Sequence, residues 1–247
     1  MRALFLRGLT REIRHWNGFP EMLKEKTGAE VLTLDLPGSG INHHQVSPKE
    51  INLYIEALRK QVGPGSPIVL IGISMGGMIA LRWAELYPQE IHSVFAINTS
   101  AKNITGPAKR FNPGLWKSIL KIITTAQVSQ KEKEILNITT NKLSESKKAE
   151  ILNLFVRIQK ESPVSLISSI NQLLAARKFV IYSPLKVPTT LIYSLGDRLV
   201  SPKCSIDLAR LLKADLEVHP DAGHDLPLDD PQWLLSVIMK HLKFQYV

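Results

Sequence analysis

The stretch Ile68-Val-Leu-Ile-Gly72-Ile-Ser74-Met-Gly-Gly77 decides the fold that we predict for this chain. Its first four residues form a short apolar run, which is typical of a buried parallel strand. The residues from Met75 onward are typical of a helix that ends before Pro88. Ser74 therefore falls on a sharp turn between a strand and a helix, with a glycine two residues away on either side. The alternative is a buried strand followed by a glycine-containing helix, but the position of the motif between the two elements favours a nucleophilic serine.

Five other short apolar runs resemble the one before Ser74. They occupy residues 3–6, 31–34, 94–97, 189–193 and 216–218. Each is too short and too apolar to have a solvated face, so each predicts a buried strand. Ser47-Pro48-Lys49-Glu50 reads as a capping box that starts a helix, and Ser201-Pro202 precedes a second one. The alternation predicts an α/β fold with a doubly wound, mostly parallel sheet of about six strands.

Residues 102–183 show a helical pattern without strands. Apolar residues recur at helical spacing in three groups: Trp116, Ile119, Leu120 and Ile123; Ile151, Leu154, Phe155 and Ile158; Leu166, Ile170, Leu173 and Leu174. We therefore predict a core formed by residues 1–101 and 184–247, with a helical insertion at residues 102–183.

The net charge is concentrated in that insertion. The chain has 247 residues, with 31 Lys and Arg against 22 Asp and Glu, for a formal charge of +9. Residues 102–183 contain 14 of the basic residues and 5 of the acidic ones, so the remainder of the chain is neutral. Because the predicted core carries no net charge, and no zinc-finger or helix-turn-helix signature occurs, the sequence disfavours nucleic-acid binding.

Cysteine content and hydropathy restrict the class of protein further. Cys204 is the single cysteine, which excludes an intrachain disulfide framework. Only four apolar residues separate Arg2 from Arg7, too few for a signal peptide. The longest nearly apolar stretch is interrupted and shorter than the roughly 18–20 residues that span a membrane. We expect a soluble, cytoplasmic protein.

A serine nucleophile needs a base that an acid holds in orientation, and two downstream loops supply both. Asp197 lies on the turn after the strand at 189–193, and His224 lies in a glycine-containing loop after the last strand. Because the carboxyl ends of parallel strands share one edge of a sheet, we expect both residues to meet Ser74 there. Asp221 and Asp225 share the loop of His224, and we favour loop acceptors over the triad acid for them.

Two backbone N–H groups are candidates for an oxyanion hole. Met75 begins the helix after Ser74, and Leu9 follows the first strand in Arg7-Gly8-Leu9. For Leu9 the alternative is a strand end with a permissive glycine. The adjacent His43 and His44 are candidate metal ligands, but without a nearby Cys or carboxylate cluster we favour a solvated loop. No metal or cofactor is required.

Acidic pairs and isolated histidines complete the set of polar candidates. Asp229 and Asp230 precede Pro231 and are predicted to cap the last helix. The sequence indicates no partner for the remaining histidines His15, His92, His219 and His241.

Together these motifs resemble the α/β-hydrolase fold family along the whole chain. Gly72-Ile-Ser-Met-Gly-Gly77 looks like its nucleophile elbow, Asp35-Leu-Pro-Gly38-Ser-Gly40 looks like its Asp-x-Pro-Gly-x-Gly segment, and Asp197 and His224 stand where its acid and base stand. The resemblance implies that the helical insertion is a cap over the active site. Members with an aspartate nucleophile are excluded because position 74 is serine.

The resemblance also implies a role for each candidate. Ser74 would be the nucleophile, His224 the base and then the acid, and Asp197 its orienting group, with the N–H groups of Leu9 and Met75 as oxyanion hole. Two features depart from the family pattern. Arg7 stands where many members have histidine, and the chain starts at the strand that usually comes third, which predicts the shortened six-stranded sheet.

The size, the cap and the stretch Arg7-Gly-Leu-Thr-Arg-Glu-Ile-Arg-His-Trp16 resemble the small serine esterases that include the pimeloyl-acyl-carrier-protein methyl ester esterase. This implies that a basic cap could receive an acidic carrier protein. The apolar cap faces, with Trp116 and Phe155 among them, suggest a mainly hydrophobic acyl group. We predict a serine hydrolase of carboxylic esters that works through an acyl-enzyme. Alternatives are an acyl transferase or lyase on the same fold, and a receptor that binds a ligand in the pocket.

Overall fold

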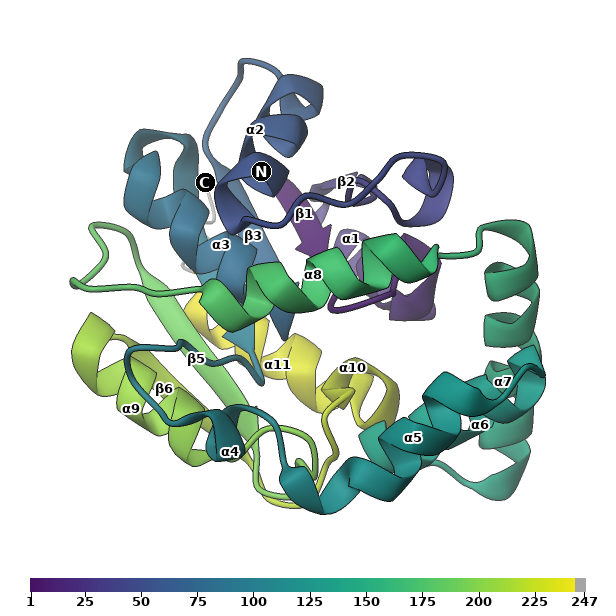
Figure 1. Cartoon of the computed structure of the whole chain (residues 1–247). Helices are drawn as coiled ribbons and strands as arrows, with labels where there is room; N and C mark the ends of the chain where they lie inside the picture. Colours follow the sequence, from purple (N-terminus) through teal and green to yellow (C-terminus); the bar gives the residue numbers. More distant parts are fainter. Residues whose placement is uncertain (243–247) are drawn as a thin grey trace.

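A parallel sheet runs through the centre of the molecule (Figure 1). The computed structural model describes residues 1–242, and within them the sheet has six strands in the order β2-β1-β3-β4-β5-β6, each pair parallel. The strands are β1 Arg2–Leu6, β2 Glu30–Leu32, β3 Ile68–Ile73, β4 Ile91–Ile97, β5 Thr189–Ser194 and β6 Asp215–His219. The predicted α/β fold with a doubly wound sheet is confirmed.

Helices cover both faces of the sheet. They are α1 Phe19–Thr27, α2 Ile51–Val62, α3 Met75–Leu86, α9 Lys203–Leu212, α10 Leu226–Asp229 and α11 Pro231–His241, with short 3₁₀ helices η1 Ile13–Trp16, η2 Gly40–Asn42 and η3 Pro88–Glu90. Alternate residues of β3 point to opposite sides, so Leu70 belongs to the buried cluster that includes α2, α3 and α9, whereas Ile71 belongs to the one that includes α1 and α11. This two-sided burial explains the continuous apolar runs of the central strands.

The strand order creates a switch point between β1 and β3. The chain adds β2 on one side of β1 and then crosses to β3 on the other side. Loops that leave the carboxyl ends of strands at such a point diverge and leave room for a ligand. The loops after β1 and β3 carry Leu9 and Ser74, so the topology itself locates the candidate site.

The segment between β4 and β5 is helical. Its helices are α4 Pro107–Arg110, η4 Pro113–Leu115, α5 Trp116–Thr124, α6 Val128–Thr139, α7 Glu145–Glu161 and α8 Leu166–Lys178, all inside the predicted bounds 102–183. In Figure 1, α8 lies in front of the strands and α5, α6 and α7 form a group beside it. Leu136 of α6 and Ile151, Phe155 and Ile158 of α7 form a small core of their own against Leu228.

Two of the three predicted apolar faces in this segment are not buried. The α7 group packs as expected, but Trp116, Leu120 and Ile123 of α5 are exposed, and so are most of the apolar residues of α8. Helix α8 instead buries Ser168, Asn171 and Gln172. Helical spacing identifies an apolar face, but long-range partners decide which face turns inward.

The edge strand β6 also differs from the prediction. Leu216 and Val218 of β6 are 39% and 44% exposed, so the prediction that no strand has a solvated face is wrong there. The prediction holds for β3, which is buried throughout. An edge strand lies at the margin of the helical layers, where their cover ends.

The predicted capping box at Ser47 is wrong. Helix α2 begins at Ile51, and its N-cap residue Glu50 makes no side-chain capping bond. Ser47 Oγ donates to Pro37 O at 2.8 Å and accepts from Gln172 Nε2 at 3.1 Å. Its hydroxyl therefore joins the loop after β2 to α8, a use that the local sequence pattern does not reveal.

No helix within residues 1–242 is both long enough and apolar enough to cross a membrane. The cytoplasmic location stays a prediction from the sequence.

Candidate active site

Ser74 occupies the turn between β3 and α3 with a strained backbone. Its φ of 56° and ψ of −119° lie in a region that non-glycine residues rarely adopt. Two hydrogen bonds to β4 and the residues after it fix the turn. Ser74 N donates to Ile97 O at 2.9 Å, and Ser74 O accepts from Thr99 Oγ1 at 2.8 Å. The neighbouring strand β4 thus fixes a conformation that the serine would not adopt alone.

Glycines around Ser74 permit a close approach of three segments. A Cβ on Gly72 would lie 2.3 Å from Gly76 O, and a Cβ on Gly76 would lie 2.0 Å from Leu6 O. On the opposite side, a Cβ on Gly8 would come within 3.1 Å of Ser74 Cβ. The loop after β1 therefore passes directly beside the serine, where only a hydrogen atom fits well.

Asp197 and His224 face each other at the same edge of the sheet. Asp197 Oδ2 lies 2.7 Å from His224 Nδ1, and the side chains are 1% and 8% exposed. The other carboxylate oxygen of Asp197 accepts the N–H groups of Leu199 at 2.8 Å and Val200 at 3.0 Å. Because its second oxygen is bound in this way, Asp197 presents the first to the imidazole in a fixed orientation.

The pKa of His224 is raised above its ordinary value of 6.5. Burial of the ring alone would lower this pKa, but the negative charge of Asp197 and its hydrogen bond to Nδ1 outweigh that effect. Asp225 raises the pKa further, while Arg7 opposes the shift. The arrangement stabilises an imidazolium, which is what a base that accepts a proton from a serine must become.

Asn98 positions the His224 loop, and the sequence analysis did not identify it. It follows β4 with a positive φ of 46°, and its Nδ2 donates to His224 O at 2.9 Å. Its Oδ1 accepts from Ser194 N at 2.9 Å, which ties the ends of β4 and β5 together. A polar residue directly after a parallel strand is the signal that could have indicated it.

Two cavities open beside Ser74. One of about 190 Å³ is lined by Ser74, His224 and the β1 loop that contains Leu9, and one of about 340 Å³ is lined by Ser74, Leu9 and Met75. The structure thus brings four of the five predicted residues to these cavities, with Asp197 behind His224. Trp116 and Phe155 do not line either one, contrary to the expectation that they mark the pocket. The apolar walls are formed by Phe111, Ile119, Ile122, Ile135 and Ile138 in the first and by Met78, Phe111 and Leu173 in the second.

Arg7, the departure from the family pattern, is neutralised beside the site. It lines the smaller cavity, and its Nη1 and Nη2 donate to the two carboxylate oxygens of Asp225 at 3.0 and 2.6 Å. The guanidinium lies 5.1 Å from the centre of the Trp16 ring. Asp225 therefore joins the β1 loop to the His224 loop as a paired anion, in keeping with its predicted role as a loop acceptor.

The other aspartates near His224 serve the loops around it. Asp221 pairs with Lys142 at 3.0 Å, and Asp230 caps α11 by accepting from Trp233 N at 3.1 Å. Asp229 does not cap that helix, contrary to the prediction. Its carboxylate accepts from Gly223 N at 2.6 Å and from Asn141 N, so it joins the His224 loop to the connection between α6 and α7.

The Asp-x-Pro-Gly-x-Gly segment has a structural role, which depends on Asp35. Its carboxylate accepts from Ile13 N at 2.8 Å and Ile41 N at 3.0 Å. Gly40 has a φ of +53°, and a Cβ there would lie 1.9 Å from Asp35 Oδ2. Burial raises the pKa of Asp35, against the effect of those two backbone donors. Asp35 therefore joins the loop after β2 to η1, and residues 35–40 line neither cavity at Ser74.

Most histidines outside the site have polar partners. His15 contacts Arg11 and Glu12, His219 lies 3.2 Å from Asp230, and His241 lies 2.6 Å from Glu217. His43 Nδ1 lies 2.9 Å from Gly40 O. Within residues 1–242, no three His, Cys, Asp or Glu side chains are grouped so that they could hold a metal ion.

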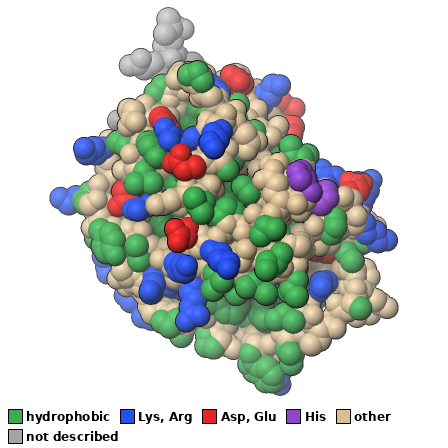
Figure 2. Space-filling model, turned by 45° about the horizontal axis from the view of Figure 1, so that its top comes forward, with side chains coloured by type: hydrophobic (Ala, Val, Ile, Leu, Met, Phe, Trp, Pro, Cys, Tyr) green, Lys and Arg blue, Asp and Glu red, His purple; other side chains and the backbone are tan. Residues whose placement is uncertain are grey.

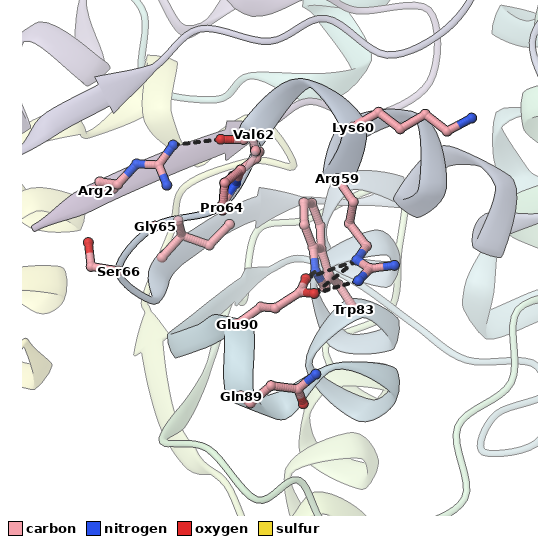
Figure 3. Close-up of a pocket in the computed structure, with 12 residues that line it drawn as sticks. Arg2, Arg59, Lys60, Val62, Pro64, Gly65, Ser66, Trp83, Gln89 and Glu90 are labelled. Atoms are coloured by element: carbon pink, nitrogen blue, oxygen red, sulfur yellow. Dashed lines mark hydrogen bonds and ion pairs between the residues drawn. The ribbon is translucent and has the colours of Figure 1, made fainter.

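A larger cavity of about 480 Å³ lies at the opposite, amino end of β3 (Figure 3). Arg59 pairs with Glu90, which also accepts from Trp83 Nε1 at 2.9 Å, and Arg2 donates to the backbone carbonyl Val62 O at 2.8 Å. None of the predicted site residues lines it. Its volume exceeds that of the cavities at Ser74, but it contains no pairing of a nucleophile with a base.

Parts of this chain resemble known proteins in sequence. Two curated relatives match short stretches. The biotin biosynthesis bifunctional protein BioHC of Teredinibacter turnerae is 33% identical over 99 residues, 39% of this chain and 17% of that protein. The homoserine O-acetyltransferase of Carboxydothermus hydrogenoformans is 44% identical over 52 residues, 21% of this chain and 14% of that protein. The matched part is well under two thirds of either relative.

The fold is shared with solved structures over nearly its whole length. The crystal structure of a lipase-esterase related protein from Clostridium acetobutylicum has a TM-score of 0.76 at 17% identity, covering 98% of this chain and 94% of that one. At the level of sequence, a family model described as alpha/beta hydrolase fold matches residues 4–231. Because that match includes the β1 loop, the Ser74 turn, Asp197 and His224, the chain belongs to the alpha/beta hydrolase fold family.

Proposed function

We propose that this protein is a serine hydrolase that cleaves carboxylic esters with a mainly hydrophobic acyl group. Membership of the family supports a hydrolase. The main support for a serine mechanism is the 2.7 Å contact between His224 Nδ1 and Asp197 Oδ2, together with the φ of 56° at Ser74. Ser74 and His224 line one cavity, so a bound ester could contact both.

In the proposed mechanism, Ser74 Oγ attacks the ester carbonyl carbon while His224 Nε2 accepts its proton. Asp197 keeps the imidazole oriented and stabilises its positive charge. The N–H groups of Leu9 and Met75 donate to the oxyanion of the tetrahedral intermediate. His224 then protonates the leaving alcohol. Water, activated by the same histidine, hydrolyses the acyl-enzyme and restores the free serine.

The substrate class follows from the walls of the cavities. Isoleucines from α5 and α6 line the smaller cavity, and Phe111 lines both. Such walls favour an apolar group by removing its surface from water. Arg7 is paired with Asp225 and offers no uncompensated charge to attract an anionic acyl group. The smaller cavity therefore suits a hydrophobic acyl chain, whereas Arg110 and Arg177 line part of the larger one.

Covalent labelling tests the proposal. A fluorophosphonate probe should label the wild-type protein at Ser74, and Ser74→Ala should abolish both the labelling and the hydrolysis of p-nitrophenyl esters. Ser236→Ala removes an exposed serine of α11 and is the matched control, which should retain both. Full hydrolysis by Ser74→Ala, with unchanged folding by circular dichroism, would refute the assignment. A panel of esters that varies in acyl length and charge then defines the substrate.

Acyl transfer is a second candidate, favoured by the 44% identity to a homoserine O-acetyltransferase over 52 residues. Transfer needs the same acyl-enzyme, with an alcohol or thiol replacing water in the second step. Product analysis distinguishes the two. An ester of the added acceptor that forms faster than the free acid would favour transfer, and free acid alone would favour hydrolysis.

A further inference from the structure

Helices α5 and α8 both expose large apolar side chains. Six of them are between 47% and 74% exposed, and we call these six together the outer cap face: Trp116, Leu120, Ile123, Leu166, Ile167 and Ile170. Isolated exposed apolar residues are common on protein surfaces, whereas several on two helices of one segment indicate a surface that binds something.

Buried hydrogen bonds hold α8 with its apolar side outward. Gln172 accepts from Thr10 N at 2.7 Å and donates to Ser39 Oγ and Ser47 Oγ at 3.1 Å. Asn171 donates to Ser47 O at 2.9 Å. Turning the apolar side inward would leave these buried polar groups without partners, at a high cost. The exposure of Leu166, Ile167 and Ile170 is therefore built into the packing of the helix.

The outer cap face adjoins the cavities at Ser74. On α5, Ile119 lines the smaller cavity, one turn from the exposed Ile123. On α8, Leu173 lines the larger cavity, one turn from the exposed Ile170. A partner that covered the outer cap face would lie next to the entrance of the candidate active site.

The charge around this face is positive. Lys117 Nζ lies 5.6 Å from the centre of the Trp116 ring, and Arg177 and Lys178 end α8. Within residues 1–242, each acidic residue of the insertion is paired with a cation: Glu132 with Arg11, Glu134 with Lys121, Glu145 with Lys148, Glu150 with Lys147 and Glu161 with Arg14. Figure 2 shows hydrophobic side chains gathered on the lower part of one face of the molecule, with Lys and Arg side chains beside them.

We infer that the outer cap face docks onto the surface of an anionic phospholipid bilayer. Leucine, isoleucine and tryptophan flanked by lysine and arginine are what helices that lie in a lipid interface present to it. A second copy of this chain fits poorly, because a symmetric contact would bring two basic surfaces together. An acidic protein would also complement the cations, and it enters the test below as an outcome that overturns the inference.

Vesicle binding tests the inference independently of catalysis, because the full-length Ser74→Ala variant is used. The fraction of this variant that sediments with neutral vesicles of phosphatidylcholine is compared with the fraction that sediments with anionic vesicles of phosphatidylcholine and phosphatidylglycerol. We expect binding to the anionic vesicles, weaker binding to the neutral ones, and loss of binding as salt is raised. Trp116 fluorescence should shift to the blue on binding, whereas Trp16 and Trp83 are already buried and Trp233 is partly buried against the core.

Surface variants locate the contact. Trp116→Ser with Ile123→Ser on α5, and Ile167→Ser with Ile170→Ser on α8, should each weaken partitioning by about tenfold or more because they remove apolar side chains from the lipid contact. Leu53→Ser is the matched control, since Leu53 is 53% exposed on α2. All variants should keep the wild-type circular dichroism spectrum, as each change is at an exposed position.

Three results would overturn the inference. One is absence of binding to anionic vesicles, and another is equal binding by the surface variants and the Leu53→Ser control. The third is binding to an acidic acyl carrier protein, or self-association, that is lost in the surface variants while vesicle binding is unaffected. Since Ser74 is absent from the measured protein, none of these results bears on the proposed hydrolase activity.

Discussion

Gly76 illustrates at the residue scale how a single hydrogen atom permits the Ser74 turn. A Cβ at this position would lie 2.0 Å from Leu6 O and 2.8 Å from Arg7 O. Both neighbours are backbone atoms of β1 and its loop, which cannot move away as a flexible side chain could. The glycine lets the first turn of α3 pack against β1 and so sets the separation of Ser74 from Gly8.

Gly76→Ala is expected to destabilise the protein by about 1–3 kcal/mol through overpacking. The control is Gly106→Ala, where φ is −63° and nothing lies within 4 Å of an added Cβ. That change should be neutral or stabilise by about 0.4–1 kcal/mol, because alanine reduces the entropy of the unfolded chain. Urea unfolding measures both, and equal midpoints for the two variants would contradict the argument.

The pH dependence of activity tests His224. Its pKa is raised above 6.5, with burial opposing the shift and the charge of Asp197 producing it. Because the base must be neutral to accept the serine proton, kcat/KM should rise with pH through a midpoint above 6.5 and level off beyond it. A midpoint below 6.5 would exclude this assignment.

Asp197→Asn should lower that midpoint and reduce kcat by about 10⁴, as loss of the orienting carboxylate does in a serine protease with this triad. Asp221→Asn is the matched control in the neighbouring loop, since Asp221 pairs with Lys142 at the surface. It should leave both the midpoint and kcat unchanged. A comparable loss in both variants would mean that loop structure, not the charge of Asp197, is responsible.

At the scale of elements, three arginines fix the loop between β1 and α1 that carries Leu9. Arg7 pairs with Asp225 of the His224 loop, Arg11 with Glu132 of α6, and Arg14 with Glu161 of α7. The Arg11 and Glu132 side chains are 8% and 4% exposed and lie 2.7 Å apart. The candidate oxyanion donor is thus held by the insertion as well as by the core.

Breaking the buried pair should be costly. Glu132→Gln leaves Arg11 buried without its anion, and we expect a loss of about 3–5 kcal/mol in the free energy of unfolding. The double variant Arg11→Met/Glu132→Leu should recover most of that loss, because no unpaired charge remains. Glu150→Gln, which breaks the exposed pair with Lys147, is the control and should change stability by less than about 1 kcal/mol. Additive effects of the single changes in a double-mutant cycle would contradict the coupling.

At the scale of the whole molecule, a buried histidine links folding to pH. His15 is 1% exposed and contacts the Phe155 ring of α7. Burial holds its pKa well below 6.5, and the charges of Arg11 and Arg7 lower it further. The ring is therefore neutral in the folded protein, whereas it binds a proton in the unfolded chain at mildly acidic pH.

The free energy of unfolding should consequently fall as pH falls below 6.5, since the unfolded chain takes up a proton that the folded chain does not. The decrease continues until the pH reaches the lowered pKa of His15. In His15→Gln, whose side chain does not titrate, the slope of stability against pH should be smaller over this range. The slope is the readout, so a uniform loss of stability in the variant does not affect the test. Identical slopes would show that His15 is not the linked group.

The sequence by itself determined the parallel strands, the turn that carries Ser74 and the edge of the sheet at which Asp197 and His224 lie. Apolar runs and glycine spacing describe local backbone geometry, and in a parallel sheet the carboxyl ends of all strands meet at one edge. From that rule alone, we could expect Asp197 and His224 beside Ser74, although they follow it in the sequence by 123 and 150 positions. The catalytic roles of these residues stay predictions that the variants above test.

Only the tertiary structure decided which groups hold those residues in place. Asp225 pairs with Arg7 across 218 positions of sequence, and Asn98 binds the carbonyl of His224 across 126. It also decided that α8 buries its amides and turns leucine and isoleucine outward, and that Ser47 binds a loop instead of capping a helix. The spacing of apolar residues in the sequence indicates which residues share a face of a helix. The direction of that face depends on hydrogen bonds and ion pairs to distant segments, which no local pattern contains.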